Sequence, residues 1–173
     1  MRPLHVYTVE GIILKKRAVG EADRMLTVFT KQKGKIRVLA KGVRRITSRR
    51  AGHLEVFSRV LLTLHTRGVW DLVTEAQALT QGSASIGYAY CMCELVDQLL
   101  ADRQEHQDVY LLLQHGLAQV VNSETMSDFV HKLLWMLGFL PKDNHLAQDR
   151  IQPYVEWITE RRFRTWPLLA ALA

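Results

Sequence analysis

The sequence predicts an α+β protein in which an all-β half, a small five-stranded barrel, precedes an all-α half of a few short helices. Two patterns support this fold class. Short apolar or β-branched segments separated by turn residues fill the first 79 residues, and apolar residues recur with a period of about 3.6 after residue 83. The turn-forming residues Gln81-Gly82-Ser83 stand between the two patterns. We therefore expect a strand domain over 1–79, a linker over 80–83 and an α-helical domain over 84–173.

Five short strands are expected in the first half. The expected strands are Tyr7–Lys15, Arg24–Thr30, Lys35–Val43, Val56–Thr66 and Trp70–Leu79. A turn over Lys31–Gly34 separates two of them, and Arg67-Gly68 forms another turn. This density of short strands favours closure into a barrel, because closure leaves no unpaired strand edge exposed.

Helices are expected throughout the second half. The apolar positions that share a helix face are Tyr88, Cys91, Leu95 and Leu99, then Val109, Leu112, Leu113 and Leu117, then Phe129, Leu133 and Leu137. Thr125 and Asp128 form a candidate capping box for the third helix, which Gly138 and Pro141 should end. A fourth helix is expected from Ile151 to about Arg164.

Positive charge is concentrated in the N-terminal third of the chain. Residues 1–60 contain 15 lysines and arginines against 4 acidic residues, whereas residues 61–173 contain 8 against 13. No Asp or Glu occurs from Arg24 to Leu54. Charge segregated in this way indicates a polyanionic partner such as nucleic acid. The candidate nucleic-acid-binding residues are Lys31, Lys33, Lys35, Arg37, Lys41, Arg44, Arg45, Arg49 and Arg50.

The expected third strand places part of this basic tract on one surface. Its apolar residues alternate with Lys35, Arg37 and Lys41, so the period-2 geometry of a strand directs the bases outward. The arginines that follow share a loop with hydroxyl side chains, and such a loop can track a phosphate backbone. The alternative is an ordinary solvated face, although ordinary surfaces intersperse both signs of charge. Phe29 and Phe57 are expected in the core, so the tract favours backbone recognition with little base readout.

The sequence offers little for catalysis or metal binding. It contains no phosphate-binding loop, zinc-protease motif or nucleophile elbow, so an enzyme is not expected. Cys91 and Cys93 lie two apart on an expected helix, where side chains project about 200° apart, and are expected to be buried structural thiols. Glu21 and Asp23 are expected to hold a turn or to pair with Arg24. Neither a metal nor another cofactor is expected.

Several short motifs have the spacing of a known family. They are Glu10-Gly11-Ile12-Ile13-Leu14, Gly20-Glu21-Ala22-Asp23-Arg24, Leu26-Thr27-Val28-Phe29-Thr30, Gly34-Lys35, Ala40-Lys41-Gly42-Val43-Arg44-Arg45, Ser48-Arg49, and Gly52 with Leu54. This pattern resembles the opening of the recombination mediator RecO family. A weaker likeness continues through Tyr88-Ala89-Tyr90, Glu94-Leu95 and the segment from Leu133 to Pro141.

The resemblance implies an N-terminal OB-fold followed by a helical domain. It also implies a role in DNA repair and recombination, with binding of single- and double-stranded DNA, strand annealing, and help in loading RecA onto strands coated by single-strand-binding protein. The implied partners are DNA, RecR and the acidic C-terminal tail of the single-strand-binding protein, with RecA engaged indirectly. The implied location is the bacterial cytoplasm, in association with the nucleoid, and no nucleotide hydrolysis is implied.

The chain departs from the family at one point and leaves two questions open. Many members carry a four-cysteine zinc module after the segment that ends at Pro141, whereas this chain continues without a cysteine over Lys142–His145, so zinc is not expected. Trp135 and Trp157 are expected to be helical core, with a tail-binding groove as the alternative. An OB-type RNA-binding protein associated with ribosomes or tRNA remains the alternative function, because a basic barrel does not select its polymer.

Overall fold

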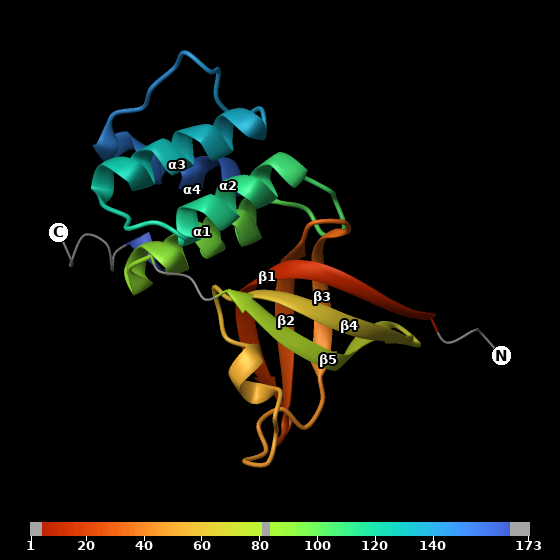
Figure 1. The fold of residues 1–173 in the computed structure, drawn as a ribbon. Coiled ribbons are helices and arrows are strands. Elements are labelled where there is room, and N and C mark those ends of the chain that lie inside the picture. Colours follow the sequence, from red (N-terminus) through yellow and green to blue (C-terminus); the bar gives the residue numbers. More distant parts are fainter. Residues whose placement is uncertain (1–4, 81–83, 167–173) are drawn as a thin grey trace. The chain divides into compact units, whose positions relative to one another are not determined.

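The computed structural model describes residues 5–80 and 84–166, which divide into two compact units. The first unit contains the strands together with residues 100–107, and the second unit contains the helices. Five strands are followed by four helices, which confirms the predicted α+β fold class (Figure 1). The expected linker over 80–83 falls, apart from Thr80, outside the described residues.

The first unit is a closed five-stranded barrel. Its strands are β1 (His5–Val19), β2 (Asp23–Thr30), β3 (Gly34–Ala40), β4 (Arg59–Arg67) and β5 (Trp70–Thr80). They hydrogen-bond in the order β1-β2-β3-β5-β4, and β4 pairs with β1 to close the ring. Every pair is antiparallel except β3 with β5. A small closed barrel of this kind is the architecture of an OB-fold.

The long strand β1 closes the barrel because it pairs on both sides. Its residues His5–Ile12 pair with β4, and its residues from Gly11 to Val19 pair with β2. A register shift between Ile13 and Lys15 bends the strand between its two partners. The expected strand over 7–15 is too short, because both ends of β1 are largely exposed and lack the apolar alternation that marks a strand.

Apolar side chains from all five strands fill the barrel. Val43 and Leu54, the latter next to the short 3-10 helix η1 (Ala51–His53), extend this core beyond the strands. Phe29 is fully buried, as expected, whereas Phe57 is partly exposed. The remaining core residues are Val9, Ile13, Leu26, Val28, Ile36, Val38, Ala40, Val60, Leu62, Leu64 and Val73.

Residues 100–107, which we call the strap, pack on the outside of the barrel against β3. Asp102 forms a parallel bridge with Lys35, and the backbone N–H of Arg103 donates to the Lys35 carbonyl at 2.8 Å. The strap approaches so closely that a methyl group on Gly34 would lie 2.0 Å from the Gln104 carbonyl oxygen. The contact therefore depends on a glycine at the start of β3.

The second unit contains four helices. They are α1 (Ile86–Leu99), α2 (Gln107–Leu117), α3 (Ser123–Met136) and α4 (Gln148–Thr159). The expected capping box at Thr125 and Asp128 is wrong. Asn122 is the N-cap and Thr125 is the third helical residue, and each side chain accepts the backbone N–H of the other at 2.9 Å. The fourth helix ends before Arg164 because Glu160 adopts a left-handed φ of 53°.

Cys91 and Cys93 are both buried on α1, as expected. Burial is the main cause that raises the pKa of Cys91 to about 12, and burial also raises the pKa of Cys93. Because the thiolate is the reactive form, both groups are unreactive near neutral pH. No helix in the described part of the chain is long and apolar enough to cross a membrane.

Substitution of Gly34 tests how the strap is seated. Gly34 and Gly20 both have positive φ, 64° and 56°, but nothing lies within 4 Å of a methyl group built on Gly20. We expect Gly20→Ala to cost about 1–2 kcal/mol from backbone strain alone. Gly34→Ala should cost about 1–3 kcal/mol more, because its methyl group collides with the strap. Urea unfolding of the two variants measures the difference, and equal losses would show that the strap moves away freely.

Candidate nucleic-acid interface

The structure divides the nine candidate bases into three groups along the β2–β3 hairpin and the loop after it. Lys31 and Lys33 lie at the hairpin tip, Lys35 and Arg37 lie on β3, and the other five follow β3. Their exposure differs: Lys35 is buried, Lys31 and Arg50 are half-buried, and the rest are exposed. The tract is therefore not one uniform basic surface.

The hairpin tip is held by local hydrogen bonds. The Thr30 hydroxyl donates to the Gly34 carbonyl at 2.8 Å and accepts the Lys33 N–H at 3.0 Å. The Lys33 ammonium lies 4.6 Å from the centroid of the Tyr7 ring. Burial is the main cause that raises the pKa of Tyr7, and the neighbouring Asp71 carboxylate adds to it. The hairpin tip thus holds the exposed Lys33 next to the Tyr7 ring.

The strap partly neutralises the bases on β3. The Asp102 carboxylate lies 3.5 Å from the Lys35 ammonium and 3.3 Å from the Arg37 guanidinium. The expectation that Lys35 faces solvent is wrong, because a segment more than 60 residues further along the chain covers it. Arg37 remains accessible, with 61% of its side chain exposed. An exposed ion pair contributes at most about 1 kcal/mol, so a phosphate can compete with Asp102 for Arg37.

The first residues of the loop over 41–50 are held to the barrel by hydrogen bonds. The Gly42 N–H donates to the Asp23 carboxylate at 2.7 Å, so Asp23 holds a turn, as expected. This turn also ends β3 at Ala40 rather than Val43. Arg44 donates to the Gly20 carbonyl at 3.1 Å, which ties the loop to the turn between β1 and β2.

Arg50 has a structural position in this loop. Its guanidinium donates to the carbonyls of Val73 at 2.5 Å and Lys41 at 2.9 Å, so it joins the end of the loop to its start and to β5. Arg50 is one of the predicted nucleic-acid-binding residues, but two of its N–H groups already donate to these backbone carbonyls. It therefore shapes the loop that presents the other bases.

Four exposed bases of this loop have no acidic partner among the residues that the structure describes. In the described part of the chain, no ion pair involves the side chains of Lys41, Arg44, Arg45 or Arg49, which we call the loop bases. Glu55, the next acid in the sequence, instead pairs with Lys16 and with Arg24, the latter at 3.7 Å. The loop bases are thus the largest exposed group of the tract without an ion pair among the described residues.

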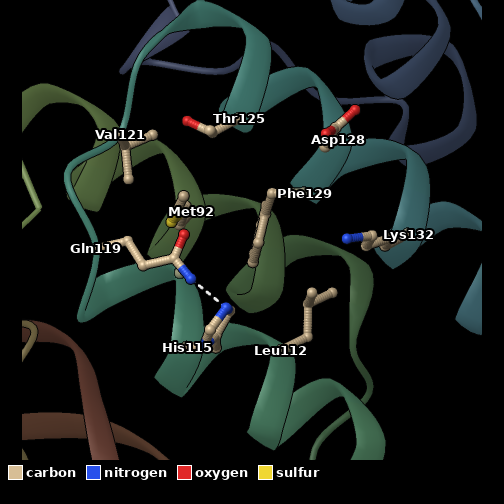
Figure 2. Close-up of a pocket in the computed structure, with 10 residues that line it drawn as sticks. Met92, Leu112, His115, Gln119, Val121, Thr125, Asp128, Phe129 and Lys132 are labelled. Carbon is tan, nitrogen blue, oxygen red and sulfur yellow. Dashed lines mark hydrogen bonds between the residues drawn. The ribbon is translucent and has the colours of Figure 1, made fainter.

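The helical unit contains a pocket of about 110 Å³ that sequence analysis missed. Met92, Leu112 and Phe129 supply apolar surface, and Asp128 and Lys132 of α3 lie along one side (Figure 2). The Gln119 amide contacts the His115 ring at another edge. The sequence gives no signal for this pocket, because its residues come from three helices and the connection between two of them.

Trp135 and Trp157 are not core residues, contrary to expectation. Their exposed fractions are 41% and 73%. The Lys142 ammonium lies 5.0 Å from the Trp135 ring centroid, and Trp157 lies 6.0 Å from Tyr154. Trp135 is three residues from Lys132, so the two lie on one face of α3, next to the pocket.

Two family models match the chain. Residues 1–81 match the model for the N-terminal part of recombination protein O, and residues 83–143 match the model for its C-terminal part. The chain is 35% identical over 156 residues to the DNA repair protein RecO of Nocardioides sp. (strain ATCC BAA-499 / JS614), a match that covers 83% of the chain and 64% of the relative.

A second relative gives a similar result. The DNA repair protein RecO of Symbiobacterium thermophilum is 33% identical over 147 residues, which cover 79% of the chain and 58% of that protein. The chain thus spans less than two thirds of the length of these curated relatives.

Removal of the Asp102 charge tests whether Arg37 belongs to the interface. Asp102→Asn frees Arg37, so we expect affinity for a mixed-sequence oligonucleotide to rise about threefold to tenfold at 0.1 M salt. Stability should fall by about 1–3 kcal/mol, because a buried ammonium loses a carboxylate. Fluorescence anisotropy and urea unfolding measure the two effects.

Glu105→Gln is the matched control for this variant. It makes the same change of net charge within the strap, at an exposed residue that forms no ion pair in the described part of the chain. Equal affinities of the two variants would show that Arg37 takes no part in binding.

Proposed function

The chain belongs to the recombination protein O family, and on that premise we propose that it is a DNA-binding recombination mediator that binds single- and double-stranded DNA. The loop bases carry this proposal. They are four exposed cations that form no ion pair with any described residue, on a loop whose ends are hydrogen-bonded to the barrel. Phosphates are the ligand that such an arrangement fits, since it supplies charge without a geometry that selects particular bases.

Strand annealing follows from the same surface as a binding effect. Two complementary strands repel each other through their phosphates, and the loop bases lower this repulsion when both strands lie against them. No bond is made or broken, so the proposed activity needs no catalytic residue. The described residues contain no group of three or more side chains that could hold a metal ion.

The proposed partners are RecR, the single-strand-binding protein and, indirectly, RecA, whose loading onto coated strands the chain would assist. The pocket in the helical unit is the candidate site for the acidic tail of the single-strand-binding protein. A volume of about 110 Å³ accepts one apolar side chain, since cavities of a similar size bind benzene. Lys132 supplies a positive charge at its edge, and Asp128 on the same helix limits how many acids the site tolerates.

The loop bases can be tested with the variant Arg45→Glu/Arg49→Glu. Neither side chain forms a hydrogen bond or an ion pair in the described part of the chain, so the fold should be preserved. We expect weaker binding to single- and double-stranded DNA of any sequence. If wild type contacts about four to six phosphates, log K against log salt should have a slope of about −3 to −5, and the variant's slope should be shallower by about 1.5.

The control is Arg161→Glu/Arg162→Glu, which makes the same charge change at exposed positions of the helical unit. The same three proteins should be compared in annealing of complementary strands coated by single-strand-binding protein, where only the loop variant should be slow. A wild-type slope near zero would exclude the interface. Tighter binding of RNA than of DNA of matched sequence would favour the ribosomal or tRNA-binding alternative.

The pocket can be tested with a peptide of the acidic tail. We expect Lys132→Glu to weaken peptide binding at least tenfold, because an attraction becomes a repulsion at the pocket edge. Arg150→Glu, at an exposed position outside the pocket, makes the same change of charge and should have little effect. Isothermal titration calorimetry at low salt measures both, and equal affinities would move the tail to another surface.

A further inference from the structure

The turn between β4 and β5 exposes two large apolar side chains in a fixed geometry. Arg67 pairs with Trp70 across the hairpin, which leaves a two-residue turn of Gly68 and Val69. Gly68 has a φ of 65°, and glycine with positive φ at the first central position is typical of a tight type II′ hairpin turn. Val69 is 87% exposed and Trp70 is 47% exposed. The barrel thus holds an indole ring in solvent on a rigid element.

The strands on either side of β5 each carry an exposed arginine, Arg37 on β3 and Arg67 on β4. The parallel pairing of β3 with β5 joins Val38 to Asp71 and Leu39 to Leu72. Arg37 and Trp70 are the residues that precede the first of these pairs on the two strands. Val38 and Asp71 are buried, so the alternation of each strand directs Arg37 and Trp70 to the outer face. Arg67, the cross-strand partner of Trp70, is exposed as well. The strand that carries Trp70 therefore lies between two strands that each carry an exposed arginine.

The Trp70 ring differs from the other tryptophan rings of the chain. Trp135 has the Lys142 ammonium over it, Trp157 contacts Tyr154, and Trp166 contacts Phe163. Within the described residues, Trp70 has neither an aromatic nor a cationic partner on its ring. Its surface is thus open to a planar group from another molecule.

We propose that Trp70 is a stacking platform for one base of a single strand, and that Arg37 and Arg67 hold the phosphates on either side. The proposal rests on the proposed function and deepens it, because it adds a contact that only single strands can make. Bases in a duplex are already stacked on their neighbours, whereas bases of a single strand are free to stack on an aromatic side chain. Loops of OB-folds between the last two strands are also a common place for oligonucleotide contacts.

The charge around Trp70 favours a nucleic acid over a protein as its occupant. An exposed apolar pair at a hairpin tip can also serve as an anchor in a protein interface. Here the two adjacent strands carry the exposed residues Arg37 and Arg67, although Arg37 also pairs with Asp102. The loop bases that follow β3 are positive as well, so the charge on these elements fits a polyanion rather than an apolar surface. A protein partner at this turn would leave DNA affinity unchanged when Trp70 is substituted.

Two substitutions at Trp70 test the proposal through strand preference. We expect Trp70→Ala to weaken binding of a single-stranded oligonucleotide about 5- to 150-fold, which corresponds to the loss of one stacked base, and to change duplex affinity less than about twofold. Trp70→Phe, which keeps a ring, should retain most of the affinity. Trp157→Ala, which removes an exposed tryptophan from the helical unit, is the control and should change neither affinity. Fluorescence anisotropy at fixed salt measures all four proteins.

Tryptophan fluorescence gives a second measurement that does not depend on the alanine variant folding. In a chain with Trp135→Phe, Trp157→Phe and Trp166→Phe, the remaining emission comes from Trp70, and it should be quenched by oligo(dT) but not by a duplex. Unquenched emission, or equal loss of single-strand and duplex affinity in Trp70→Ala, would overturn the proposal. If only Arg45→Glu/Arg49→Glu weakens binding, this proposal fails and the proposed function stands. If wild type binds no DNA, both fail.

Discussion

The seam between β3 and β5 is the constraint on which the rest of the barrel depends. It is the only parallel pairing among the described strands, and two residue pairs define it, Val38 with Asp71 and Leu39 with Leu72. The antiparallel pairings extend over seven or more residues each. The strap reinforces this short seam from outside, because Asp102 pairs with both bases of β3 while Arg103 lies 3.8 Å from the Asp71 carboxylate on β5. Closure of the barrel thus relies on the strap, which follows α1 and leads into α2 in the sequence.

The strap also decides which positive charges face solvent. Charge in this chain is segregated along the sequence but less so in space, since Asp102 is brought back to β3 and Glu55 to the bases of β1 and β2. The loop bases have no such acidic partner among the described residues. A buried lysine with a carboxylate partner is costly to separate from it, whereas an exposed arginine is not. The same aspartate therefore fixes Lys35 in the structure and leaves Arg37 available to a phosphate.

Local patterns were sufficient to predict the strands, the helices and the buried positions of Phe29 and the two cysteines. Each of these depends on residues close together in the sequence, where period 2 or period 3.6 carries the information. Periodicity does not encode contacts between distant segments. Such contacts bury Lys35, place the hydrogen bonds that Arg50 makes to Val73 and Lys41, and form the pocket on α1–α3. The sequence predicted the candidate site as a list of basic residues. The folded barrel was needed to show that these residues divide among the hairpin tip, β3 and the following loop. Trp70 was expected within a strand. Only the pairing of β5 with β3 and β4 showed which strands lie on either side of it.

The two kinds of contact proposed here act differently on the two states of DNA. Phosphates are present on single strands and duplexes alike, so the proposed contacts of the loop bases would be made with both. A stacking contact is available only while a base is unpaired, and it is lost when two strands anneal, because the base then stacks on its neighbours. In a mediator with both contacts, the stacking contact would favour the single-stranded substrate and would oppose the stronger attraction of the phosphate-dense duplex to the loop bases. Loss of the stacking contact would then aid release of the duplex after annealing without nucleotide hydrolysis, since base pairing takes the base away from Trp70.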